Sequence, residues 1–215
     1  LAVRARGVDA AVAAVPAELT NDPGLLYERA RWRRKARRTT DALPLLLQIP
    51  SEFGPAQGPD RVWYEREVHI NRAVRNHDYA LAYQLAAEHG MDPELSSADY
   101  ADAEWLAGWF ALDRLGEPEN AGEHFARLTA AVSTPISLAR GLYWQGRAAE
   151  AAGDPTAAEE HYRAAAGHST AYYGQLAATR LTTLNAQSIP EAIEPTDADK
   201  LAFYANPLAR ATAIL

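Results

Sequence analysis

Apolar residues recur along most of the chain at the three- and four-residue spacing of amphipathic helices, and period-two alternation is never long enough for a strand of consequence. Glycine, proline and aspartate divide this pattern into short helices joined by brief connections, as antiparallel neighbours require. We therefore predict an all-α protein. The predicted helices span residues 8–15, 24–38, 41–48, 59–76, 78–89, 97–115, 118–132, 135–152, 155–166, 169–184 and 197–214.

Several predicted helices have recognisable starts. Asp41 and Asp78 are predicted N-caps, because an aspartate side chain can accept a hydrogen bond from a free backbone N–H of the first turn. Pro118, Pro135 and Pro155 lie at or near first-turn positions, where the missing N–H of proline has no cost.

An internal repeat indicates the architecture. Two predicted helices each contain an internal and a terminal glycine: Gly108 with Gly116, and Gly146 with Gly153. Each is followed by a helix whose residues at i, i+4 and i+7 form a similar stripe. The stripe of Ala121, Phe125 and Leu128 recurs 37 residues later as Ala158, Tyr162 and Ala165. The second unit resembles a tetratricopeptide repeat, and we expect Gly146, Ala158 and Tyr162 to be buried at one hairpin interface. The prediction is a solenoid, or superhelix, of stacked antiparallel helical hairpins with a concave surface.

Charge and composition exclude several classes of function. The net charge of −7 argues against a nucleic-acid binder, although residues 29–38 hold seven basic residues and no acid. The stretch from Ala42 to Ser51 is about half the length of a membrane helix and contains two prolines, so no membrane span is predicted. The sequence has no cysteine, no HExxH motif and no glycine-rich phosphate loop, so we predict no metal site and no cofactor.

The segment boundaries follow composition. Residues 1–185 are predicted to form one helical-hairpin domain, and residues 186–199, which are acidic and proline-bearing, a linker. Residues 200–215 are predicted to be the start of a separate helical segment.

The order and spacing of five segments resemble a known family. They read RARWRRKARRTTDALPLLLQIP, RVWYEREVHINRAV with DYALAYQLAAEHG, AEWLAGWFALDRLGEPENAGEHF, PISLARGLYWQGRAAEAAGD and AYYGQLAATRL, and they cover about residues 22–184. The pairing of the fourth segment with YYGQLA one hairpin later is the most specific feature. This pattern resembles the superhelical part of the soluble lytic murein transglycosylases.

The resemblance implies a periplasmic helical scaffold for a lysozyme-like domain that cleaves the bond between N-acetylmuramic acid and N-acetylglucosamine and leaves 1,6-anhydromuramoyl ends. In that family one glutamate, followed directly by serine, acts as acid and then base. No Glu-Ser pair and no GLMQ-type segment occurs in this sequence, so no catalytic residue is carried over. FYANPLARATAIL resembles the helix that leads into the catalytic domain. The expected function is scaffolding and peptidoglycan guidance without activity of its own, with glycan strands, the absent catalytic domain and cell-wall proteins as partners.

Candidate glycan-binding residues come from two segments. Arg33, Arg34 and Arg37 of the cationic segment are candidates to meet the stem-peptide carboxylates of peptidoglycan; the alternative is that they pair with acids on neighbouring hairpins. Tyr172 and Tyr173 are candidates to stack against sugar rings; the alternative is core packing.

Two other functions stay open at this point. A tetratricopeptide-like adaptor would grip a peptide or protein on the same concave surface. A chain that retains activity through an unrecognised glutamate would release soluble anhydromuropeptides from sacculi.

Overall fold

The computed structural model describes residues 7–51, 58–181, 194–207 and 209. Within these ranges the protein is all-α, with eleven α-helices and no β-strand. Contacts between Cα atoms divide the chain into two units, Leu1–Thr183 and Leu184–Leu215.

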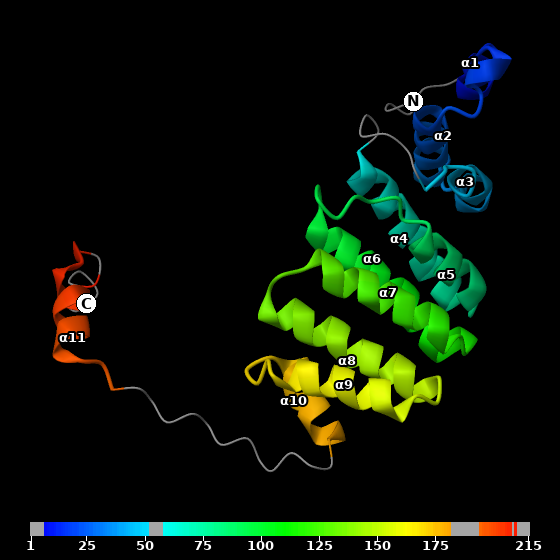
Figure 1. Ribbon diagram of the computed structural model, residues 1–215. Helices are drawn as coiled ribbons and strands as arrows, with labels where there is room; N and C mark the ends of the chain where they lie inside the picture. The colour runs from blue at the N-terminus through cyan, green and yellow to red at the C-terminus, as the bar shows by residue number, and fades with distance from the viewer. Residues whose placement is uncertain (1–6, 52–57, 182–193, 208, 210–215) are drawn as a thin grey trace. The chain divides into compact units, whose positions relative to one another are not determined.

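In the described residues of the first unit there are ten α-helices and two short helical segments of other types (Figure 1). The α-helices are α1 (Val8–Ala13), α2 (Pro23–Lys35), α3 (Thr39–Leu46), α4 (Pro59–Arg75), α5 (Tyr79–Ala87), α6 (Ser97–Trp109), α7 (Pro118–Ala131), α8 (Pro135–Ala151), α9 (Pro155–Ala166) and α10 (Tyr172–Arg180). A 3-10 turn, η1 (Ala17–Leu19), follows α1, and a π-helical segment, η3 (Phe110–Leu115), extends α6.

Helix starts follow the local signals in most places. Asp78 caps α5 as predicted, since its carboxylate accepts a 3.2 Å hydrogen bond from the N–H of Leu81. The prediction for Asp41 is wrong: α3 begins at Thr39, and the Asp41 carboxylate instead accepts a 2.8 Å hydrogen bond from Nε of Arg38. Prolines occupy the first position of α7, α8 and α9 as predicted, at Pro118, Pro135 and Pro155.

From α4 to α10 each helix packs against the next one along the chain, and α2 packs against α3, whereas α3 meets α4 only sparsely. The most extensive packing joins α2 with α3, α4 with α5, α6 with α7, α7 with α8, and α8 with α9, and α10 packs against both α8 and α9 (Figure 1). Contacts of α5 with α6 and of α7 with α8 join successive pairs. Buried apolar side chains form one large cluster from α2 to η3 and two smaller clusters among α7 to α10 and η3.

The predicted glycine–aromatic packing is confirmed, and it occurs twice. A Cβ built at Gly146 of α8 would lie 2.6 Å from Cε1 of Tyr162 on α9, and Ala158 is buried at the same interface. A Cβ at Gly108 of α6 would lie 2.6 Å from Cε1 of Phe125 on α7. In both pairs an aromatic ring occupies the space that a Cβ at the glycine would need, so the absence of a side chain lets the two helices approach closely.

The second unit contains one described helix, α11 (Asp197–Ala205). The hydroxyl of Thr196 caps α11 at the N–H of Asp199, and the Asp199 carboxylate accepts a 2.9 Å hydrogen bond from the N–H of Thr196. Residues 186–193 of the predicted linker, and residues 208 and 210–215 of the predicted C-terminal helix, lie outside the described residues. None of the helices in the described ranges has the length and apolar composition needed to cross a bilayer.

Candidate functional site

The cationic segment does not present its basic side chains on a single surface. Nη1 of Arg33 donates a 2.9 Å hydrogen bond to the backbone oxygen of Asp41, which ties α2 to α3. Arg34 turns the other way, toward α4. Arg37 lies beyond the end of α2, is exposed, and has a φ of 63°, in the left-handed region. The structure therefore separates the three predicted arginines and places only Arg34 at a cavity.

Arg34 forms the main polar contact between α2 and α4. Its Nε and Nη2 lie 2.5 Å and 2.7 Å from the two carboxylate oxygens of Glu65, whose side chain is buried. The hydrogen bond to Glu65 raises the pKa of Arg34, so this arginine keeps its charge. We call this bidentate ion pair the α2–α4 clamp. Its geometry is the one in which guanidinium and carboxylate groups match best.

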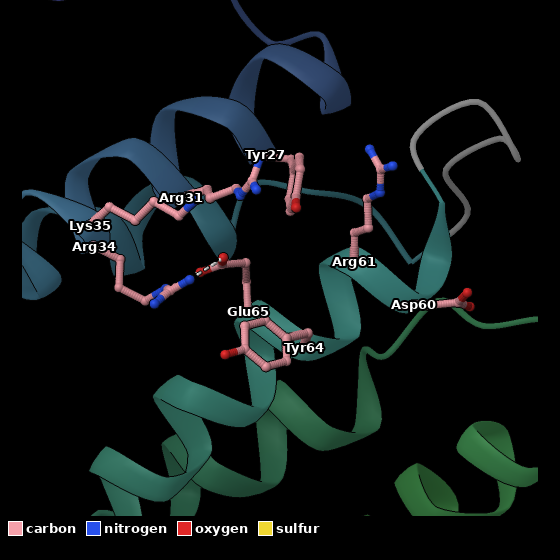
Figure 2. Close-up of a pocket in the computed structure, with 8 residues that line it drawn as sticks. All are labelled: Tyr27, Arg31, Arg34, Lys35, Asp60, Arg61, Tyr64 and Glu65. Carbon is pink, nitrogen blue, oxygen red and sulfur yellow. Dashed lines mark hydrogen bonds and ion pairs between the residues drawn. The ribbon is translucent and has the colours of Figure 1, made fainter. Parts of the chain in front are cut away.

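A pocket of about 640 Å³ lies beside the clamp (Figure 2). Helix α2 contributes Tyr27, Arg31, Arg34 and Lys35 to its lining, and the first turns of α4 contribute Asp60, Arg61, Tyr64 and Glu65. Two phenol rings therefore line a cavity with four cations and two carboxylates. We call this cavity the α2–α4 pocket.

A second candidate region follows aromatic rings across α6, α8 and α10. Trp105 and Trp109, one turn apart on α6, are stacked with ring centroids 6.5 Å apart and planes 18° apart. Trp105 also meets Trp144 of α8 edge to face at 5.9 Å, and Trp144 lies 6.5 Å from Tyr173 of α10. Side chains that are distant in sequence thus form one continuous chain of ring contacts, and all four are only partly buried.

An arginine lies over each of the three tryptophans in this series of ring contacts. The guanidinium carbons of Arg114, Arg140 and Arg147 lie 5.0, 5.7 and 5.9 Å from ring centroids of Trp109, Trp105 and Trp144, respectively. These distances are those of cation–π contacts. We call the four aromatic residues and three arginines the aromatic–arginine track.

The track opens into a pocket of about 430 Å³. Trp105, Ile136, Arg140 and Tyr173 line it, and Ile136 is 72% exposed. The Arg140 guanidinium also pairs with Asp102, a further lining residue, at 2.8 Å. Such a mixture of apolar and aromatic walls with a few polar groups is typical of small-molecule sites. We call this cavity the track pocket.

The two predicted tyrosines have different surroundings. Tyr173 lines the track pocket and packs against Tyr143, with centroids 5.4 Å apart, so it takes part in both the core and the surface. Tyr172 is 70% exposed and touches Tyr173 at 5.1 Å without lining that pocket. The sequence analysis missed Trp105, Ile136 and Arg140. The two tryptophans of EWLAGWF, four residues apart, were the signal that could have identified the α6 part of the track.

A buried polar cluster joins α6 and α7 and the end of α5. Oε1 of Glu104 accepts hydrogen bonds from Nε of Arg127 at 2.8 Å and Nε2 of His89 at 3.4 Å, and Nδ1 of His124 lies 2.5 Å from Oε2. Burial alone would raise the pKa of Glu104, but these three partners outweigh burial and hold the pKa well below its usual range. Because Glu104 is buried and both of its carboxylate oxygens are engaged by these partners, we interpret the cluster as structural.

Within the part of the chain that the structure describes, no three His, Asp or Glu side chains are placed to hold a metal ion. No protein-family model, curated protein or solved structure matches this chain.

Proposed function

We propose that this chain is the superhelical scaffold domain of a peptidoglycan lytic transglycosylase and that it guides glycan strands toward a catalytic domain. In this proposal the helix pairs of the first unit form a solenoid of the tetratricopeptide kind, and the protein works in the periplasm. The packing of each helix from α4 to α10 on its neighbours in sequence and the repeated glycine–aromatic contact support the solenoid.

The aromatic–arginine track is the observation on which this function depends. The faces of sugar rings carry C–H groups that pack against indole and phenol rings, and Trp105 and Tyr173 present such rings at the track pocket. Arg140 adds a cation at the same place: its Nη2 pairs with Asp102, and the guanidinium has further N–H groups that can bind a muramoyl lactyl or stem-peptide carboxylate. Glycan strands offer both kinds of group at regular intervals.

Retention on purified sacculi tests the proposal. The full chain should be retained, and the double variant Ile136→Ser/Arg140→Gln should be retained about tenfold less, because it removes an exposed apolar contact and a cation from the track pocket. The matched control is Leu95→Ser/Arg75→Gln, which removes an equally exposed apolar side chain and an exposed arginine outside that pocket. Equal retention of both variants and the unmodified chain would contradict the assignment.

A tetratricopeptide-like adaptor is the second candidate, and the exposed Ile136 favours it. An apolar side chain of this size, 72% exposed beside a cavity, is what a protein partner covers on binding. Passage of the chain through a sacculus column without retention, together with capture of a cell-wall protein that Ile136→Ser abolishes, would support the adaptor over the glycan scaffold.

A further inference from the structure

The α2–α4 pocket holds more positive charge than its own carboxylates neutralise. The α2–α4 clamp satisfies Glu65, and the only other carboxylate of the lining is Asp60. Lys35 and Arg61 form no ion pair with any described residue. Nη1 of Arg31 lies 3.6 Å from the carboxylate of Glu28 on the same helix. Because both side chains are about one-third exposed, this ion pair contributes little energy. Cations are therefore free to bind an anion that enters the pocket.

The hydroxyl of Tyr27 lacks a hydrogen-bond partner. The residue is 5% exposed, and no described residue accepts from or donates to its hydroxyl. Figure 2 shows the ring extending from α2 toward α4 with its oxygen directed into the space between them. Burial raises the pKa of Tyr27, so the hydroxyl stays protonated and can donate. The hydroxyl oxygen itself is reached by solvent, so an acceptor on a ligand in the pocket can take its hydrogen bond in place of water.

The arrangement of the charges indicates what kind of anion fits. Arg31 and Lys35 lie one turn apart on α2, whereas Arg61 comes from the opposite wall on α4. Cations on opposite walls match separated carboxylates better than one compact anion. Asp60 would repel a phosphate but can accept hydrogen bonds from the amide or ammonium groups of a peptide. The volume of about 640 Å³ lies in the range of sites for ligands larger than phosphate.

We propose that the α2–α4 pocket binds a short peptide with two or more carboxylates, between Arg31 and Lys35 on one wall and Arg61 on the other. Tyr27 donates a hydrogen bond to one carboxylate, and the exposed ring of Tyr64 packs against the peptide backbone or side chains. The source of this peptide rests on the proposed function: in peptidoglycan, it is the stem peptide of the glycan strand. Binding of the peptide itself rests on the pocket alone.

Calorimetric titration of the full chain with two isosteric peptides tests the proposal without any substitution. The probes are N-acetyl-Glu-Glu-amide, which has two negative charges, and N-acetyl-Gln-Gln-amide, which has none. We expect the acidic peptide to bind at least about tenfold more tightly, because each charge-assisted hydrogen bond is stronger than a neutral one. Inorganic phosphate should compete weakly. Equal affinities for the two peptides, or competition by phosphate at the same concentration as the acidic peptide, would overturn the assignment.

Substitutions then locate the site. Lys35→Gln/Arg61→Gln removes two exposed cations of the lining and should weaken binding of the acidic peptide by about tenfold or more. The control Arg29→Gln/Arg75→Gln removes the same charge from the same two helices outside the pocket and should leave the affinity within about twofold. Tyr27→Phe should weaken binding by about tenfold, the value of one hydrogen bond to a charged group. Equal losses in the Lys35/Arg61 and control variants would show that only net charge matters and would refute the site.

Failure of this inference can be distinguished from failure of the proposed function. Retention on sacculi with no preference for the acidic peptide would refute the peptide site and leave the glycan scaffold standing. Selective binding of the acidic peptide by a chain that sacculi do not retain would refute the glycan scaffold and uphold the pocket.

Discussion

Replacing Gly146 by alanine tests the close packing that repeats along the chain. A Cβ at this position would lie 2.6 Å from Cε1 and 2.7 Å from Cδ1 of Tyr162. Carbon atoms in protein cores are normally separated by about 3.5–4.0 Å, so either the ring or the α8 backbone must move by roughly 1 Å. A single methyl group therefore disturbs the interface between α8 and α9.

The surroundings of Tyr162 determine the size of the effect. The ring is 4% exposed, packs against Tyr143, and donates a 2.8 Å hydrogen bond from its hydroxyl to Glu150. Overpacking a core costs about 1–3 kcal/mol. Alanine in place of glycine inside a helix gains about 1 kcal/mol, so we expect Gly146→Ala to lower the free energy of unfolding by about 1 kcal/mol.

Gly122 supplies the matched control. It lies in the interior of α7, and a Cβ there would meet only the Cβ of Ala148, at an ordinary 3.9 Å. Gly122→Ala should therefore raise the free energy of unfolding by about 0.5–1 kcal/mol through helix propensity alone. Urea unfolding followed by far-UV circular dichroism measures both variants. The double variant Gly146→Ala/Tyr162→Ala should show favourable coupling, because truncating the ring removes the clash. Equal stabilisation by the two single alanine substitutions would refute the reasoning.

Four further predictions concern charges and activity. Glu104→Gln should lower the free energy of unfolding by about 3 kcal/mol, since it breaks a buried ion pair. The depressed pKa of Glu104 means that its stability contribution is present above the ordinary pKa of 4.5 and is lost as the pH falls, so this variant should flatten the acid side of a stability profile. Arg34→Gln leaves Glu65 buried without its partner and should cost about 1–3 kcal/mol in urea unfolding, whereas Arg37→Gln should cost under about 0.5 kcal/mol. Retention on sacculi should fall as salt rises to about 0.5 M if the cationic segment contributes, and unchanged retention would remove it from the glycan path. Incubation with sacculi should release no soluble anhydromuropeptide on chromatography, and release that one glutamate substitution abolishes would contradict this.

The helices and the glycine–aromatic repeat could be predicted because their signals are local. The prolines that begin α7, α8 and α9 act through their own backbone, and Asp78 reaches a donor only three residues away. Asp41 looked the same in sequence but is engaged by Arg38, so its side chain is not available as a cap. Helix α3 begins two residues before Asp41, at Thr39, so Asp41 lies inside the first turn and not at the cap position.

The candidate sites depended on contacts that no local pattern contains. A helical pattern continued to residue 38 would place Arg33, Arg34 and Arg37 on neighbouring faces, but α2 ends at Lys35 and the backbone turns at Arg37. The partner of Arg34 is 31 residues away, at Glu65. Sequence therefore identified the cationic helix but not which of its charges are already neutralised.

The two pockets differ in the forces that would hold a ligand, and this difference can be measured on one polymer. The track pocket offers mainly ring faces and the exposed Ile136, whose contribution rises in strongly excluded salts. The α2–α4 pocket offers mainly cations near the surface, whose contribution is screened. Ile136→Ser should therefore reduce the part of sacculus retention that persists in high salt. Lys35→Gln/Arg61→Gln should reduce the part that high salt abolishes. If both variants reduce the same share, the two pockets do not bind independently.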